Sequence, residues 1–256
     1  KYTGGTGTSV GRTIVDEGIG FDVSNISRFS IGDVQVVSNN GVEYFHDDVT
    51  SSNGGVNPAD GTSALLGVFT NTTFNYSILS FTPGLRYNWY TLSGSGTPST
   101  RYGTFNVDNT EGSLDPRITV AVNVTDWLQP YVTWSRSMRA PTLQETMLGG
   151  DHPGTASATF VPNPDLKPET QQGWEFGVNI QTRRLLTDND NLRLRANYFI
   201  MDVDDYIAAA YSPALRAYRF VNVEGSSQVD GFEFEANYDA RVAFGANTPQ
   251  TIKAFK

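Results

Sequence analysis

Apolar and polar side chains alternate with a period of two residues along most of this chain, which is the pattern of β-strands. One of the clearest stretches lies between residues 79 and 89, where the apolar parity holds Leu79, Phe81, Leu85, Tyr87 and Trp89. The alternation predicts about ten strands of about ten residues each, with a bend or bulge where Gly41 interrupts the second of them. The predicted strands cover residues 18–30, 34–44, 63–74, 79–89, 117–124, 128–134, 174–181, 192–200, 218–223 and 232–239.

The segments between these strands are alternately short and long. Polar, glycine- and proline-containing stretches at 51–61, 93–111 and 139–170 predict long loops, and 206–215 predicts a loop of middling length. Short turns are expected near Gly32, at Asn75–Ser77, at Thr125–Asp126 and at Asp188–Asp190. In an up-and-down sheet this alternation places every long loop at one end and every tight turn at the other.

The polar parity of the predicted strands is charged. Its members include Arg86, Arg117, Glu175, Arg193, Arg195, Glu233 and Glu235. An apolar face that ends in aromatic residues, opposite a charged face, is typical of an all-β, antiparallel, up-and-down transmembrane β-barrel with a polar interior. A soluble β-sandwich with one wet face also alternates, but it rarely needs such different loop lengths at its two ends.

Composition supports the all-β prediction and excludes several classes of protein. The 256 residues are 38% hydrophobic and 12% aromatic and include 25 glycines, which suits one large β domain. No run of about 18 apolar residues is present, so a transmembrane helix is excluded. Absence of cysteine removes thiol catalysis, thiolate metal sites and disulfides. A net charge of −9 without a basic face argues against nucleic acid as a partner.

No motif for catalysis is present, so we do not expect an enzyme. Asp202, Asp204 and Asp205 lack the glycine-centred spacing of a calcium loop and are interpreted as a solvated strand end. Serine residues near His152 lack the glycines of a nucleophile elbow. We therefore expect neither a catalytic residue nor a catalytic cofactor.

The two histidines occur in different contexts. His46 lies where a predicted strand runs toward a long loop, and we interpret it as a rim residue. His152 lies between two glycines and a Pro-Gly pair, which can present an imidazole at the tip of a loop. A neutral imidazole is the usual protein ligand of haem iron, although a single loop histidine can equally be a solvated residue.

Several stretches resemble TonB-dependent outer-membrane receptors. They are Tyr-Val-Thr-Trp-Ser-Arg-Ser-Met-Arg-Ala-Pro at 131–141, Asn-Pro-Asp-Leu-Lys-Pro-Glu-Thr at 163–170, and the segments 81–87, 218–223 and 229–233. Members of that family carry a plug domain inside a barrel of about 22 strands. No plug or energy-coupling box is recognisable here. The resemblance therefore implies that residues 1–256 are the C-terminal part of a large barrel domain, with a long extracellular loop at 139–170.

A finer resemblance concerns haem. Haem and haemophore receptors of this family carry a Phe-Arg-Ala-Pro box and an Asn-Pro-Asn-Leu box on either side of a loop histidine that binds haem iron. Here Arg139-Ala140-Pro141 and Asn163-Pro164-Asp165-Leu166 flank His152, while Met138 and Asp165 depart from the usual residues. The resemblance implies that His152 coordinates haem iron. It leaves open whether Arg139 is a rim contact or a structural ion pair.

The resemblance also implies a location and partners. The expected protein lies in the bacterial outer membrane, takes haem at its extracellular face, free or from a haemophore or haemoglobin, and imports it. Its partners are outer-membrane lipid and the TonB complex of the inner membrane, which acts through the plug. The alternatives are a ferric-siderophore or cobalamin receptor in which His152 is only solvated, and a passive porin or adhesin barrel.

Overall fold

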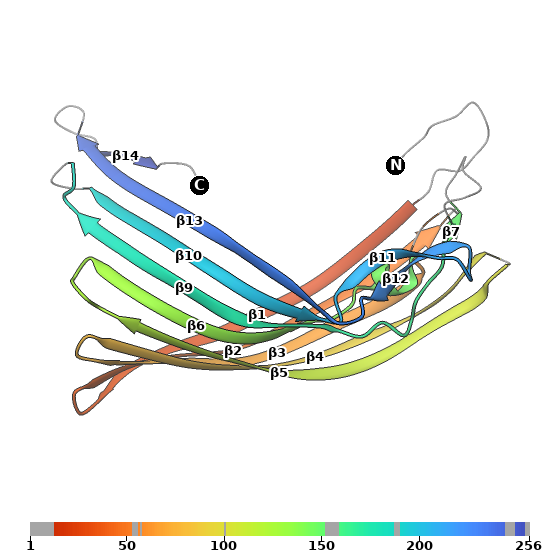
Figure 1. Ribbon diagram of the computed structural model, residues 1–256, viewed down its shortest axis with the longest axis horizontal. Helices are drawn as coiled ribbons and strands as arrows, with labels where there is room; N and C mark the ends of the chain where they lie inside the picture. Colours follow the sequence, from red (N-terminus) through yellow and green to blue (C-terminus); the bar gives the residue numbers. More distant parts are fainter. Residues whose placement is uncertain are drawn as a thin grey trace.

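A single antiparallel sheet of ten strands makes up most of the computed structural model (Figure 1). The structure describes residues 13–52, 56, 58–99, 101–151, 159–186, 190–243 and 249–253. Each strand pairs with its neighbours in chain order, which is the predicted up-and-down topology. The strands are β1 (Thr13–Ile31), β2 (Val34–Ser52), β3 (Asp60–Tyr76), β4 (Leu79–Ser99), β5 (Gly103–Val122), β6 (Leu128–Arg139), β9 (Glu169–Arg183), β10 (Asn191–Asp204), β13 (Ser226–Ala243) and β14 (Pro249–Lys253).

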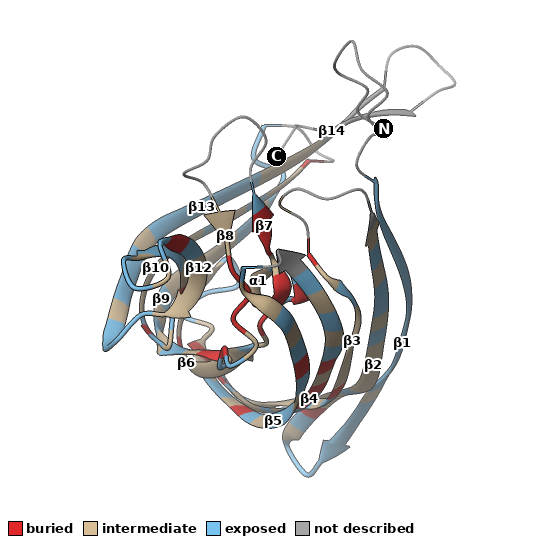
Figure 2. Ribbon diagram, turned by 90° about the vertical axis from the view of Figure 1, so that its right-hand side faces the viewer, coloured by how far each residue is buried: buried red, intermediate tan, exposed pale blue. Residues whose placement is uncertain are grey.

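Five short elements lie outside this sheet order. The helix α1 (Leu143–Met147) follows β6, and a four-stranded sheet contains β7 (Gly150–Asp151), β8 (Thr159–Phe160), β11 (Ile207–Ser212) and β12 (Ala217–Asn222). Figure 2 shows the long strands of this sheet curved into a trough, with α1 inside it. Among the residues that the structure describes, no helix is long and apolar enough to cross a membrane.

The two ends of the trough differ in their connections. At the turn end, short turns join β1 to β2, β3 to β4, β5 to β6 and β9 to β10. Gly32 in the first of these turns has a φ of 58°, a left-handed conformation that glycine adopts without strain. The opposite end, which we call the loop end, carries α1 and the four-stranded sheet. The predicted short turns lie together at one end, as expected, but two of the loops expected at the other end are largely strand: 93–111 belongs to β4 and β5, and 206–215 contains β11.

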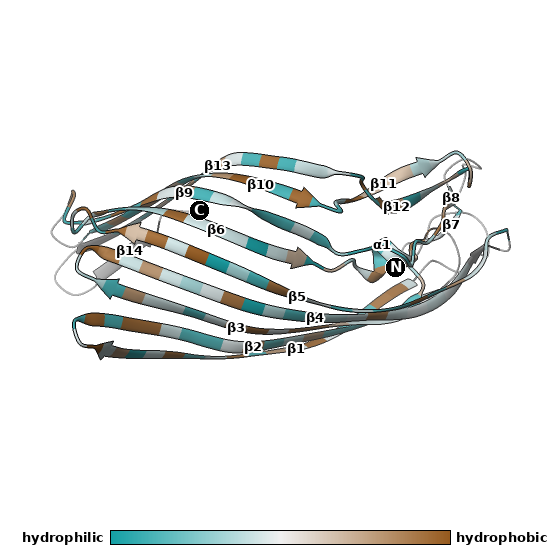
Figure 3. Ribbon diagram, turned by 60° about the horizontal axis from the view of Figure 1, so that its bottom comes forward, coloured by the Kyte–Doolittle hydropathy of each residue, from teal (hydrophilic) through white to brown (hydrophobic). Residues whose placement is uncertain are grey.

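The outer surface of the trough is apolar along the middle of the strands. Brown and teal segments alternate along the strands in Figure 3 because successive side chains point to opposite faces. The large hydrophobic side chains that remain exposed include Phe21, Leu85, Leu114, Ile118, Trp174, Phe176, Phe232 and Phe234. At about 3.3 Å per residue and a tilt of about 40°, the stretch from Leu79 to Trp89 spans the roughly 25 Å apolar band of a membrane barrel.

The opposite face of the sheet holds the charged parity, as predicted. Glu175 accepts hydrogen bonds from Arg195 at 2.6 Å and from the Tyr131 hydroxyl at 2.6 Å. Arg86 forms an ion pair with Glu43 at 2.7 Å and lies over the ring of Phe69. These contacts join side chains across neighbouring strands on the inner face.

The expected bulge at Gly41 is wrong. The register of β2 runs without a shift through this residue on both sides, against Ser24 of β1 and Phe69 of β3. A side chain at this position would meet the ring of Phe69. Gly41 is therefore explained by the space that a neighbouring aromatic ring takes, and the strand itself stays regular.

The expected long loop at 93–111 is also wrong. β4 continues to Ser99 and β5 begins at Gly103, so the two strands form one long hairpin. Beyond the apolar band most side chains are small and polar, apart from Phe105 and Val107, and the period of two is lost from the sequence although the backbone ladder continues. Thr97 and Thr104, for example, hydrogen-bond across this hairpin at 2.7 Å.

The apolar band can be tested with a charged residue at two depths of one strand face. Leu85→Arg places a guanidinium near the middle of the band and is expected to lower the free energy of unfolding by about 2–4 kcal/mol. Ser95→Arg lies on the same face of β4 beyond the band, and it should change stability by less than about 1 kcal/mol. Urea unfolding of the full-length protein in lipid vesicles measures both, and equal effects would contradict this position of the band.

Candidate functional site

The two predicted boxes lie at the loop end, where β6 and β9 separate. Arg139, the last residue of β6, pairs directly with Glu169, the first residue of β9. From this rung the chain runs through α1, β7 and β8 and returns to β9. The segment 139–170 is therefore built from short elements that pack on the inner face of the trough.

Arg139 forms two ion pairs and is structural. Its Nε donates to Glu169 Oε2 at 2.6 Å, and its two terminal nitrogens donate to the carboxylate of Glu145 at 2.9 and 3.1 Å. The second oxygen of Glu169 accepts from the Ile207 N–H at 2.7 Å, which joins β11 to the same point. A planar guanidinium suits two carboxylates at once, and this arrangement connects α1, β6, β9 and β11.

These charges lie outside the apolar band, because the rung of Arg139 and Glu169 is nearer the loop end than the rung of Trp134 and Trp174. Hydrogen bonding from Arg139 lowers the pKa of the Glu169 carboxyl, burial opposes this shift, and the Ile207 N–H adds to the lowering. The same contact with Glu169 raises the pKa of Arg139, with a further contribution from Glu145. Both groups are therefore charged at neutral pH.

The helix α1 begins with a capping box. Thr142 accepts a hydrogen bond from the Glu145 N–H at 3.1 Å, and the Glu145 carboxylate accepts from the Thr142 N–H at 2.9 Å. Threonine followed three residues later by glutamate is the sequence pattern of such a box, and it could have predicted the helix. Glu145 therefore both caps α1 and pairs with Arg139.

Ala140 and Pro141 lead from the ion pair into α1 and border a hydrophobic cluster. Leu143 and Met147 of α1 pack with Tyr90 and Leu92 of β4 and Val107 of β5, and all five are buried. Ala140 packs against this cluster, and Pro141 is itself buried. The first box, Arg139-Ala140-Pro141, thus leads directly into α1, which packs on the inner face of β4 and β5.

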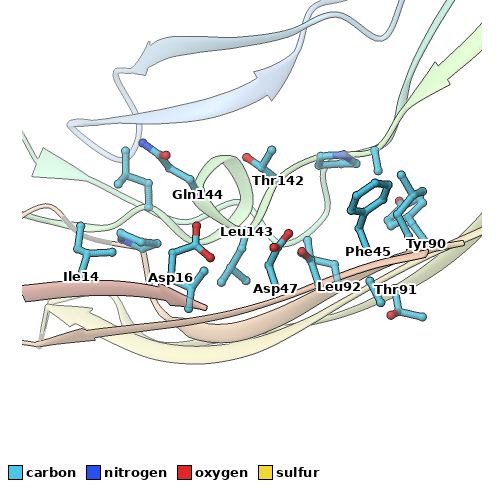
Figure 4. A pocket seen from close by; sticks show the side chains of 18 of the residues that line it. Ile14, Asp16, Phe45, Asp47, Tyr90, Thr91, Leu92, Thr142, Leu143 and Gln144 are labelled. Atoms are coloured by element: carbon cyan, nitrogen blue, oxygen red, sulfur yellow. The ribbon is translucent and has the colours of Figure 1, made fainter. Parts of the chain in front are cut away.

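A cavity of about 540 Å³ lies beside this cluster (Figure 4). Ala140, Pro141 and Leu143 line one side, and the inner face of β1–β4 lines the other. The volume is in the range of small-molecule sites, and most of the lining is apolar. Asp16 and Asp47 add two carboxylates to the wall, so the cavity disfavours an anionic ligand.

The second box holds the returning segment. Asn163 donates through Nδ2 to the Phe220 carbonyl at 2.8 Å, donates its N–H to the Thr146 carbonyl at 2.7 Å, and accepts a hydrogen bond from Arg219. The Pro164 carbonyl accepts from Asn109 of β5 at 2.8 Å, and Leu166 is buried. The box therefore joins α1, β5 and β12.

Two residues that the sequence did not reveal complete this network. Asn222 accepts from the Lys167 N–H at 2.9 Å and donates to the carbonyls of Lys167 and Asp205 at 2.9 and 2.7 Å. Arg219, which precedes Phe220 in β12, donates a hydrogen bond to Asn163. Arg219 lies 56 positions from Asn163, and Asn222 lies 55 positions from Lys167, so no local signal could have found these two contacts.

His152 lies outside the described residues. The structure describes what flanks it: β7 ends at Asp151, β8 begins at Thr159, and the two residues pair directly. The Thr159 hydroxyl also donates to Asp151 Oδ1 at 2.6 Å. Both ends of the segment 152–158 are thus held together at the loop end.

The other polar groups that the sequence analysis considered lie within or at the end of strands. His46 lies in β2, where it pairs with Ile19 and Ala64 on the outward parity. Asp202 and Asp204 end β10, and Asp205 follows with a φ of 55°. Within the described part of the chain, no group of three or more histidine, cysteine or acidic residues could hold a metal ion.

Residues 2–252 match the family described as TonB dependent receptor-like, beta-barrel, and the chain belongs to this family. The described architecture agrees with it: an all-β, antiparallel, up-and-down sheet that forms part of a large barrel. The resemblance seen in the sequence is therefore confirmed at the level of the family.

Three known proteins are informative. The chain is 28% identical over 167 residues to the hemin receptor of Yersinia pestis, an alignment that covers 62% of this chain and 23% of that protein. It is 28% identical, with a TM-score of 0.76, to a double mutant of the Serratia marcescens hemophore receptor HasR solved with its hemophore HasA and heme; the match covers 90% of this chain and 40% of that one. The siderophore receptor PiuA of Acinetobacter baumannii shares the fold, with 16% identity, a TM-score of 0.66, and coverage of 91% and 37%.

The ion pair at the base of the site predicts a pH dependence. Because the folded-state pKa of Glu169 is lowered, its contribution to stability is present above a pH of about 4.5 and is lost as the pH falls through the lowered value. Cleavage of the loop end, measured at each pH with a protease that is active there (pepsin in acid, thermolysin near pH 7) and normalised to cleavage of an unfolded peptide, should therefore rise steeply below that pH in the wild-type protein.

Glu169→Gln should weaken the loop end already at pH 7 by about 1 kcal/mol, which corresponds to about fivefold faster cleavage, since Arg139 is half exposed and keeps Glu145. The variant should also lose most of the pH dependence. Asp239→Asn, which removes an ion pair with Arg193 near the turn end, is the matched control and should leave loop-end cleavage unchanged. Identical pH profiles for wild type and Glu169→Gln would contradict the role given to this carboxylate.

Proposed function

We propose that this chain is the C-terminal part of the barrel domain of a TonB-dependent receptor in the bacterial outer membrane, and that the receptor binds haem at its extracellular face and imports it. The loop end is then extracellular, and 139–170 is an extracellular loop. The chain aligns with about a quarter of the hemin receptor and less than half of HasR, so plug and remaining strands belong to the parts of those proteins that it does not match.

One observation carries the proposal: both sequence boxes hold the segment that contains His152. Arg139 and Glu169 close its outer boundary, and Asn163 holds its returning side against α1 and β12. Nearer to the histidine, Asp151 and Thr159 bring the two ends together. Such a base supports a loop that presents one imidazole in a defined place.

His152 is proposed to coordinate the iron of the transported haem. A neutral imidazole nitrogen is a strong ligand for haem iron. Arg139 takes no part in this coordination, because its guanidinium nitrogens already donate to Glu145 and Glu169. The receptor does no chemistry on haem, which is the cargo, and energy for import comes from the TonB complex of the inner membrane through the plug.

Likeness to receptors named for haem supports this cargo over a siderophore. Identity is 28% with the hemin receptor and with HasR but 16% with the siderophore receptor PiuA, although HasR and PiuA both share the fold of this chain. The complex of HasR with HasA also supports a haem carrier, such as a haemophore or haemoglobin, as a partner of this receptor. Growth with haem, but not with a ferric siderophore, as sole iron source is the expected phenotype of a strain that depends on this receptor.

The ligand role can be measured directly. Titration of the purified full-length receptor with haemin is expected to shift the Soret band, and His152→Ala should weaken binding by about tenfold or more, that is, by about 1.4 kcal/mol or more. His46→Ala is the matched control, because it replaces the other histidine of this sequence, which lies on the outward face of β2. This variant should bind haemin like wild type. An unchanged spectrum and affinity in His152→Ala would rule out this ligand.

A further inference from the structure

Three aromatic rings form a row across the four-stranded sheet at the loop end. Tyr211 of β11 pairs with Tyr218 of β12, Tyr218 pairs with Phe160 of β8, and Phe160 pairs with Gly150 of β7. Residues directly opposite one another in a sheet share a face, so the three side chains lie on the same side. We define these residues, Tyr211, Tyr218 and Phe160, as the aromatic row.

The rings of the row contact one another. The Phe160 and Tyr218 rings stack with centroids 5.6 Å apart, and the Tyr211 ring meets Tyr218 edge-on at 5.3 Å. Even so, Tyr211 is 51% exposed and Tyr218 is 39% exposed. Neither hydroxyl hydrogen-bonds to any residue that the structure describes. The row is therefore a pre-assembled aromatic surface with free area for a ligand.

Membrane lipid does not explain this exposure. The sheet that carries the row lies at the loop end, beyond the apolar band of the long strands (Figure 1). Its backbone is held by several contacts: the Val161 N–H donates to the Tyr218 carbonyl at 2.9 Å, and Tyr102 of the β4–β5 hairpin donates to the Leu215 carbonyl at 2.8 Å. The exposed rings thus stand on a rigid support, as a binding surface requires.

We propose that the aromatic row binds the flat face of the porphyrin ring of haem; the proposal rests on the proposed haem-receptor function and assigns a subsite within it. A porphyrin is planar, apolar on its faces and carries two carboxylates at one edge. The row supplies ring faces, and the turn between Tyr211 and Tyr218 carries the exposed cation Arg216. The cavity beside α1 is the poorer place for such an anion, because Asp16 and Asp47 line it.

The row also lies beside the point from which the proposed iron ligand extends. Gly150 adds no side chain to the end of the row, and its φ of 117° is one that other residues rarely adopt. One residue later β7 ends, at Asp151. A porphyrin on the row would therefore lie next to the base of the proposed haem loop.

Iron-free protoporphyrin IX separates the ring contact from iron coordination. The full-length receptor in detergent is titrated with protoporphyrin IX, and porphyrin fluorescence reports binding. Tyr218→Ala and Tyr211→Ala should each raise the Kd for protoporphyrin IX by about tenfold, whereas Tyr218→Phe should stay within about threefold of wild type because the ring remains. Tyr76→Ala removes an exposed tyrosine at the turn end and is the matched control, with an unchanged Kd.

The outcomes separate the two proposals. Failure of the wild-type receptor to bind haemin overturns the haem-receptor function, and the subsite with it. Haemin binding by the wild type, together with protoporphyrin affinities of Tyr218→Ala and Tyr211→Ala within twofold of wild type, overturns the aromatic row alone. The same holds if both variants lose binding of a carrier protein but not of protoporphyrin, since the row would then dock a protein. Two independent alanine variants on different strands keep the test valid if one of them fails to fold.

Discussion

Pairing of the backbone across a long, curved sheet is the constraint on which this structure depends. A strand that faces lipid on one side can satisfy its N–H and C=O groups only through its neighbours, so consecutive strands pair in order and place apolar side chains outward. The inner face is then free to carry charge, and the ion pairs of Arg86 with Glu43 and of Arg195 with Glu175 occur there. The same alternation ends where the strands leave the apolar band, and from that point polar strands and short elements take over.

At that boundary one guanidinium organises the loop end. Arg139 joins the last rung between β6 and β9 to the cap of α1 through Glu145, and Glu169 extends the connection to β11. Asn163 and Asn222 then attach the returning chain to β12. These polar contacts replace the regular ladder of the long strands, and they give a firm base to the segment on which the proposed haem function depends.

Two surfaces at this end differ in the ligand they suit. The cavity beside α1 is largely apolar but has two carboxylates in its wall. The aromatic row offers ring faces on a small sheet whose backbone is anchored to β4–β5 and to the second box. Charge therefore decides between the two sites, and it favours the row for a porphyrin that carries carboxylates.

Sequence alone determined the strands inside the apolar band, the two faces of the sheet, the end at which the short turns lie, and the position of both boxes. It could do so because alternation with a period of two is a local property of the chain. The same rule failed beyond the band, where β4 and β5 continue through 93–111 with only Phe105 and Val107 to mark an apolar side. The capping box of α1 was a local signal that the alternation obscured. Only the tertiary structure decided that Arg139 forms an ion pair with Glu169 and that Phe160 joins Tyr218 and Tyr211 in one row, because the contacts of Arg139 with Glu169 and of Phe160 with Tyr218 join residues that are distant in the chain.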